Sequence, residues 1–339
     1  MTTPTPPRWA PVLLVIASMS SVQVGASISV PLFDPLGVAG TTWLRLLAAA
    51  LVLLAVARPR GLTRSGLAAA GALGVLMAAN SVLFAEATAR IPLGVTVAVE
   101  FCGPLAVAVL GRGAGPGARV GRGSRLVWPA AALTGVLLLT RPWTLGDATG
   151  RNTVLGLGFA ILAGIGWAGY IVMVGQVGRR SSGLTGLAVA LAAAALALAP
   201  LGAPQAWPAL ADAAGGSSSA LGALARCALA ALLVPMLPYA LELAALRRMD
   251  QAVFGVWMAL EPALGGLAGL TLLGQRPALV QLPGFALVVA AGIGAQRASG
   301  AIDRGAIEPT SGYPWPVPVP GGSGGSGGSG GPGGSGGPG

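Results

Sequence analysis

The sequence predicts an all-α polytopic membrane protein with ten transmembrane helices in two inverted five-helix repeats. Apolar residues make up 54% of the chain and charged residues 9%. The apolar residues gather in long uncharged stretches, many close to the roughly 20 residues that cross a bilayer core of about 30 Å. A pattern of residues in the first half of the chain also recurs 158 residues later. These three observations predict the fold class.

Each helix is predicted from an apolar stretch between turn residues or arginines. The first stretch follows Arg8, as in a secretory signal, but it is long and leads into further stretches, so we interpret it as a transmembrane helix. Glycine, proline and arginine then separate the others. The predicted helices are 11–30, 39–57, 67–89, 92–111, 126–140, 153–174, 184–202, 223–246, 251–272 and 279–296.

The arginines predict the orientation of these helices. The 20 basic residues are all arginine, and short cytoplasmic loops collect such residues. With the N-terminus in the cytoplasm, fourteen arginines fall on the inside and only Arg90, Arg141, Arg151 and Arg276 fall on the outside. We therefore expect a multi-pass protein of the cell (plasma or inner) membrane with both termini in the cytoplasm. The same distribution explains the net charge of +10 better than a nucleic-acid-binding face does.

An internal repeat divides the chain. Arg90-Ile91 and Pro104 in the first half have counterparts 158 residues later, at Arg248-Met249 and Pro262. Because five helices is an odd number, the second copy must enter the membrane the other way up, as in many secondary transporters. The predicted parts are an N-terminal cytoplasmic segment (1–10), a first repeat (11–140), a second repeat (153–297) and a Pro-, Gly- and Ser-rich tail (302–339) that has too little apolar surface to fold.

The residue types present argue against catalysis. The chain has no histidine, which is the commonest general base and neutral metal ligand. Its two cysteines, Cys102 and Cys227, cannot supply a disulfide framework or a site of several thiolates. Gly164, Gly166 and Gly169 match the dinucleotide-binding spacing but lie inside an apolar stretch, so we interpret them as helix-packing residues. We expect no enzyme, no catalytic residue, no metal and no cofactor.

Two glutamates lie near the middle of predicted helices, Glu100 in the fourth and Glu261 in the ninth. A charge at this depth costs roughly 2.5–3.5 kcal/mol on insertion scales, so it is expected to face a cavity or a partner. A structural hydrogen bond to a neighbouring helix is the alternative. Pro104 and Pro262 leave the carbonyls of Glu100 and Met258 without their usual N–H partners. These prolines predict broken or kinked helices that line a midplane cavity, although kinking alone would also explain them.

Further polar groups are candidates for the same cavity. Arg45 lies some seven residues into the second helix, or about 10 Å deep at 1.5 Å per residue. It could bind a carboxylate or extend outward to the membrane surface. Glu86 and Glu242 lie near helix ends and are interpreted as ion pairs with nearby arginines. Other candidates, each of which could instead pack or bond between helices, are Gln23, Asn80, Tyr239 and Trp257.

Several runs in the sequence carry a family resemblance. They include Ser21-Val22-Gln23-Val24-Gly25, Trp43-Leu44-Arg45-Leu46, Gly103-Pro104-Leu105, Leu237-Pro238-Tyr239-Ala240-Leu241-Glu242 and Leu260-Glu261-Pro262-Ala263-Leu264. In these runs, over roughly residues 10 to 297, the chain resembles the drug/metabolite transporter superfamily with paired EamA domains, and within it the threonine and homoserine exporter subfamily. The resemblance implies ten helices in two inverted halves and export of amino acids or related metabolites. Where the family usually has Gly-Glu after the ninth helix, this chain has Gly274-Gln275.

The expected function combines this resemblance with the buried polar groups. The resemblance implies threonine or homoserine as substrate, exported by alternating access. In that case Arg45 would receive the substrate carboxylate, and Glu100 and Glu261 would receive the ammonium group or a coupling proton. Another metabolite, an aromatic amino acid or a cationic drug is the alternative, since Trp167 and Trp257 could stack on a planar ligand. The expected partners are thus a small-molecule substrate, the lipid bilayer and a coupling proton.

Overall fold

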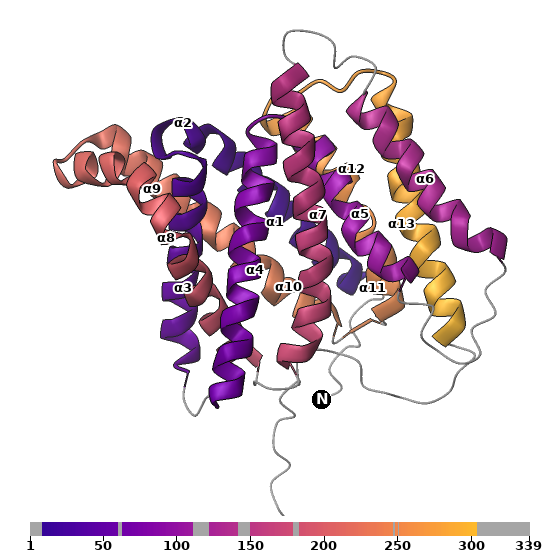
Figure 1. The fold of residues 1–339 in the computed structure, drawn as a ribbon, viewed down its shortest axis with the longest axis horizontal. Helices are drawn as coiled ribbons and strands as arrows, with labels where there is room; N and C mark the ends of the chain where they lie inside the picture. The colour runs from indigo at the N-terminus through magenta and orange to yellow at the C-terminus, as the bar shows by residue number, and fades with distance from the viewer. Residues whose placement is uncertain are drawn as a thin grey trace, which may run out of the picture.

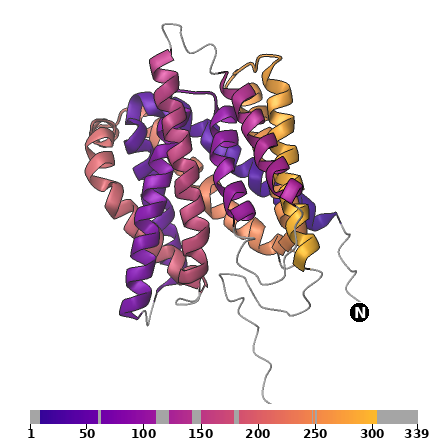
Figure 2. The same ribbon diagram turned by 45° about the vertical axis from the view of Figure 1, so that its right-hand side comes forward.

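The computed structural model describes residues 9–59, 63–110, 122–141, 150–178, 183–246, 248–249 and 251–303. Within these ranges the chain is helical, with no strand. The helices form one bundle in which the long helices run roughly side by side, and the view turned by 45° shows the same arrangement (Figures 1 and 2). The predicted N-terminal segment up to residue 8 and the predicted tail beyond residue 303 lie outside the described residues.

Each apolar stretch predicted from the sequence overlaps at least one helical segment, and the stretch 223–246 spans three. Six helical segments are long and apolar enough to cross a membrane, and four shorter apolar helices accompany them in the described part of the chain. The helices in chain order are α1 Ala10–Ser29, η1 Val30–Leu32, α2 Phe33–Leu36, α3 Val38–Ala57, α4 Arg64–Thr88, α5 Leu93–Leu110, α6 Arg122–Thr140, α7 Gly150–Gly178, α8 Gly183–Ala214, α9 Ser218–Ala231, η4 Leu232–Met236, α10 Leu237–Leu246, α11 Gln251–Met258, α12 Glu261–Leu272 and α13 Gln281–Asp303.

Local chemistry sets several of the helix ends. The Thr63 side chain accepts a hydrogen bond from the N–H of Gly66 and so caps the start of α4. α3 starts after Gly37, whose φ of 72° is a conformation that glycine adopts without strain. The first N–H groups of α3 have no partner within their own helix, and Gln205 of α8 supplies one. Its Oε1 accepts from the N–H groups of Ala39 at 3.0 Å and Gly40 at 3.2 Å.

Helices from the two halves of the chain pack against each other. α3 lies against α8, α4 lies between α7 and α8, α5 contacts α7 and α12, and α6 lies against α13. In the second half, α10 packs against α1 and α12 also contacts α1. Glycines allow close approach at several of these contacts, as they commonly do between membrane helices. A Cβ at Gly164 of α7 would lie 3.0 Å from the carbonyl oxygen of Glu100 of α5, which confirms that Gly164 is a helix-packing residue.

Two helical segments of the second half are interrupted inside the bundle. Between α9 and α10, the backbone of Val234 is extended, with φ −147° and ψ 114°. Between α11 and α12, Ala259 and Leu260 form a turn, and Pro262 lies in the first turn of α12. Pro104, the counterpart of Pro262 in the repeat, lies instead inside α5, which continues to Leu110. The break in the α9–α10 segment was not predicted from the sequence.

Candidate functional site

Glu261 lies at the break between α11 and α12. Glu261 is 6% exposed, and its Oε2 atom is buried with no hydrogen-bond partner. As the first residue of α12, it lies where the helix dipole favours negative charge. It lines a cavity of about 290 Å³ whose walls come from α5, α7, α11, α12 and α13. The other lining residues are Phe101, Pro104, Leu105, Trp167, Ile171, Phe254, Gly255, Met258 and Gly292.

Glu100 of α5 belongs to the same region. It is as buried as Glu261, and Asn80 of α4 donates a hydrogen bond from Nδ2 to its Oε1 at 3.3 Å. The Oδ1 atom of Asn80 is buried without a partner, and Gly166 of α7 lies against it. Helix α5 packs against α12, and Phe101, which follows Glu100 in the sequence, lines the cavity of Glu261. Three predicted site residues, Glu100, Glu261 and Asn80, therefore lie in one neighbourhood.

The carbonyl group that Pro104 leaves without an N–H partner is covered by α7. Gly103 and Gly164 lie directly against each other, and the backbone of Gly164 also lies against Glu100. Any residue larger than glycine at Gly103 would run into the Gly164 carbonyl. The close α5–α7 contact thus fixes the position of Glu100, while the Pro104 ring itself lines the cavity.

Glu242 of α10 is a third carboxyl group within the bundle, partly buried, which sequence reasoning assigned to a local ion pair. Arg247, the predicted partner, lies outside the described residues. The described partner is Ser18 of α1, whose hydroxyl donates to Oε1 of Glu242 at 2.8 Å. Because Glu242 lies near a helix end, the sequence did not indicate that it contacts α1. The serines that recur along α1 were the feature that could have indicated this contact.

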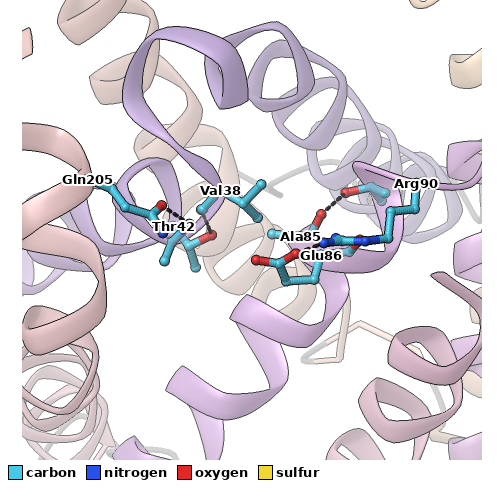
Figure 3. Close-up of polar contacts among 8 residues, drawn as sticks. Val38, Thr42, Ala85, Glu86, Arg90 and Gln205 are labelled. Atoms are coloured by element: carbon cyan, nitrogen blue, oxygen red, sulfur yellow. Dashed lines mark hydrogen bonds and ion pairs between the residues drawn. The ribbon is translucent and has the colours of Figure 1, made fainter. Parts of the chain in front are cut away.

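Glu86 behaves as the sequence predicted. Arg90 forms an ion pair with Glu86 one turn earlier on α4 and also donates to the Glu86 carbonyl oxygen (Figure 3). The guanidinium group of Arg90 additionally lies 5.0 Å from the ring centroid of Phe159. Both charged side chains are partly exposed at the end of α4. This pair is local and separate from the buried carboxyl groups.

Arg45 lies in a different part of the bundle. Its Nη1 donates to Ser29 Oγ at 3.1 Å, and its Nε is buried without a hydrogen-bond partner. Its described contacts therefore join α3 to α1, and α3 also packs against α9. They do not include Glu100 or Glu261, and Arg45 does not line the cavity of Glu261.

The remaining predicted site residues occupy distinct places. Gln23 is 2% exposed, and its unpartnered Oε1 lies next to Gly265 of α12. Trp257 packs in an apolar cluster with Val15 and Met19 of α1. Tyr239 lies on α10, but its side chain is outside the described part. The indole that lines the cavity is that of Trp167, which the sequence indicated, together with Trp257, as an indole deep in its helix that could stack on a ligand.

Gln275 takes the position at which the family usually has glutamate. Its Oε1 accepts a hydrogen bond at 3.0 Å from the N–H of Leu93, the first residue of α5. It also lines a smaller cavity, of about 180 Å³, together with Arg276 and Gln281. The amide thus satisfies an unpaired donor at the start of the helix that carries Glu100. This structural role needs an acceptor oxygen but no charge.

A bundle of apolar helices, one of them interrupted at a cavity that holds an unpartnered carboxyl group, is typical of membrane transporters. The comparisons with known proteins agree. The EamA-like transporter family matches residues 154–294. The threonine/homoserine exporter RhtA of Escherichia coli (strain K12) is 34% identical over 85% of this chain and 92% of its own length. The RhtA protein of Salmonella typhimurium (strain SL1344) is 33% identical over the same shares.

The chain belongs to the EamA-like transporter family. A solved crystal structure of a protein with 19% sequence identity superposes with a TM-score of 0.54, over 86% of this chain and 99% of that one. At this identity the likeness concerns the fold alone. It supports the arrangement of the helices and adds nothing about the substrate.

Proposed function

We propose that this protein exports small neutral amino acids of the threonine and homoserine kind by alternating access across the cell membrane. The support comes from the curated relatives, which are threonine/homoserine exporters matched over 92% of their length. The buried polar groups fit a solute that carries an ammonium group. In this proposal the bundle is a multi-pass protein of the plasma or inner membrane with both termini in the cytoplasm, as the arginines favour.

We further propose that the bundle is a ten-helix inverted repeat of residues 11–140 and 153–297. The helix ends support it, since α4 ends at Thr88 and α10 ends 158 residues later at Leu246. The starts of α5 at Leu93 and α11 at Gln251 differ by the same number. The packing is consistent with this symmetry, because α4 packs against α7 as its counterpart α10 packs against α1. The EamA match over 154–294 coincides with the proposed second repeat.

The observation that carries the proposed function is the unpartnered, buried oxygen of Glu261 at the cavity. A buried carboxyl group without a donor is costly when ionised unless a cation approaches it. A substrate ammonium group would supply that cation, and a proton would replace it when the cavity is empty. Proton coupling follows as part of the proposal. Glu100 and Asn80 would line the polar side of the site, with Gln23 and Tyr239 on neighbouring helices.

Arg45 has a less direct role in this proposal. We keep it as a receptor for the substrate carboxylate at another stage of the cycle, since its Nε lacks a partner in the described conformation. Trp257 would support the site by holding α11 against α1. Substitution of Arg45 tests its proposed role. R45K should weaken efflux of amino acids with a free carboxylate more than efflux of their amides, because lysine cannot form the bidentate pair that arginine forms.

Efflux from loaded proteoliposomes tests the proposal. Labelled homoserine and threonine should leave vesicles that contain the wild-type protein faster than they leave empty vesicles, and E261Q should abolish the difference. E86Q is the matched control, because Glu86 is a carboxylate on the same bundle that pairs with Arg90 away from the cavity. Equal efflux with and without the wild-type protein would reject this substrate class.

A second candidate function is export of aromatic or organic cations. The cavity of Glu261 is walled by Phe101, Trp167 and Phe254, and aromatic faces attract cations. A competition panel distinguishes the candidates. If tetraphenylphosphonium or an aromatic amine inhibits binding more strongly than homoserine does, the second candidate is favoured.

A further inference from the structure

The cavity of about 180 Å³ that Gln275 lines shares three helices with the cavity of Glu261. Its walls are the start of α5, the middle of α12, the start of α13 and the segment 275–277 between α12 and α13. We call it the outer cavity, because Arg276 lies on the outside in the proposed orientation. α5, α12 and α13 also line the cavity of Glu261, through other residues. The two cavities therefore lie at two levels of the same three helices.

Close contacts between α5 and α12 lie between the two levels. A Cβ at Gly94 of α5 would lie 2.6 Å from the Cα of Gly266 of α12. One turn farther along α5, a methyl group of Val97 lies 3.0 Å from the position of a Cβ at Gly265. The ring of Phe285 of α13 also lies against Gly94 and Gly266. A solute that moves along α5 and α12 from one cavity to the other must push these contacts apart, as alternating access requires.

Three residues that line the outer cavity have hydrogen-bond donors to offer. Arg276 is exposed, and within the described part of the chain no ion pair or hydrogen bond engages its guanidinium group. Gln275 accepts from the N–H of Leu93 through its Oε1, and its Nε2 has no described partner. Gly94 lies in the first turn of α5, and no described hydrogen bond uses its N–H. The donors thus come from one cation, one amide and one helix start.

The other side chains of the outer cavity do not compete for these donors. Gln281 is already satisfied, because its Oε1 accepts from the N–H of Ala278 at 2.8 Å and its Nε2 donates to the Leu139 carbonyl at 2.7 Å. None of the described lining residues is acidic. A guanidinium group, unpaired N–H groups and the positive end of a helix dipole together favour an anion that accepts several hydrogen bonds.

We propose that the outer cavity is a second solute site, which binds the carboxylate group of the amino acid after the solute leaves the cavity of Glu261. The inference rests on the proposed function, which supplies the solute and its outward direction. The carboxylate pairs with Arg276 and accepts from Gln275 and from the N–H of Gly94. The outer cavity is smaller than the roughly 300–1,000 Å³ of sites for drug-sized ligands, so it suits a small carboxylate. The two ends of the solute are thus recognised at different levels.

Equilibrium dialysis of labelled acetate against the purified full-length protein tests the inference, because acetate has a carboxylate and no ammonium group. At low ionic strength R276Q should weaken acetate binding about tenfold, and Q275E should weaken it at least as much, since it places a negative charge in the cavity. Q275E keeps the acceptor of the Leu93 N–H, so its fold is retained. R226Q is the matched control, because Arg226 is an exposed arginine of α9 that donates to the Gly222 carbonyl. R226Q should bind acetate as the wild type does.

Competition shows whether the carboxylate is that of the solute. In E261Q, which lacks the proposed ammonium partner, homoserine should displace labelled acetate, whereas homoserine amide should not, because it has no carboxylate. The inference is overturned if R276Q and Q275E bind acetate like the wild type, if R226Q weakens binding equally, or if homoserine displaces no acetate. A lack of homoserine efflux from proteoliposomes would reject the proposed function separately, and acetate dialysis would still decide whether the outer cavity binds a carboxylate.

Discussion

The contact between Gly103 of α5 and Gly164 of α7 predicts a graded series of stability losses. A Cβ at Gly103 would collide with the carbonyl group of Gly164, which is backbone and cannot turn aside. A Cβ at Gly164 would lie 3.0 Å from the Glu100 carbonyl oxygen and 3.3 Å from its Cα, so a shift of a few tenths of an ångström would relieve it. We therefore expect G103A to be more damaging than G164A.

The magnitude follows from a comparison within the same bundle. Gly158 lies on α7 like Gly164, and a Cβ there would meet nothing within 4 Å. G158A therefore changes only the helix propensity, which favours alanine by up to about 1 kcal/mol. G103A has the same favourable change in helix propensity, but overpacking also destabilises it, typically by about 1–3 kcal/mol. Measured against G158A, G103A should lower the free energy of unfolding by about 1–3 kcal/mol, with G164A in between.

Reversible unfolding in detergent micelles, followed by tryptophan fluorescence, measures these differences. G103A should also slow homoserine efflux from proteoliposomes, because separating α5 from α7 moves Glu100 away from Asn80. G158A should leave efflux unchanged. Equal stabilities of G103A and G158A would refute the reasoning, since the two variants differ in the steric contact and share the propensity change.

The remaining predictions concern polar contacts that hold single helices. Q275A removes the acceptor of the Leu93 N–H and should cost about 1 kcal/mol, whereas Q275E keeps an acceptor oxygen and should unfold near the wild-type midpoint. Q205A leaves two N–H groups at the start of α3 without their acceptor and should cost about 0.5–2 kcal/mol by the same assay. E86Q breaks the partly exposed pair with Arg90 and should cost less than about 1 kcal/mol, decreasing further in high salt.

The helices could be predicted because the bilayer leaves the backbone few choices. A long apolar stretch in lipid must satisfy its own N–H and C=O groups, so apolar length alone locates a helix. The stretch 92–111, for example, became α5 at Leu93–Leu110. The close packing of Gly164 could be predicted for a related reason, since small residues are what allow membrane helices to approach. The identity of the opposing residue, Gly103, requires the three-dimensional structure.

The composition of the site was harder to predict. Depth in a helix indicated Glu100 and Glu261, and their helices α5 and α12 pack against each other. Depth could not indicate Glu242, which lies near a helix end and receives a hydrogen bond from Ser18 because α1 packs against α10. Depth also could not distinguish Trp167, which lines the cavity, from Trp257, which packs against α1. Both tryptophans lie well inside their helices, and only the direction of each side chain separates them.

Pro104 and Pro262 show that the same residue in the same local context can lead to different backbone structures. Both residues lack the N–H that would serve the carbonyl four residues earlier, and they are equivalent in the proposed repeat. At Pro104 the helix continues, because Gly103 allows α7 to lie against the backbone and cover the carbonyl of Glu100. At Pro262 the chain forms a turn and a new helix begins with Glu261. The same missing donor thus yields a rigid helix in one half and, in the other, an interrupted helix that carries the unpartnered carboxyl group.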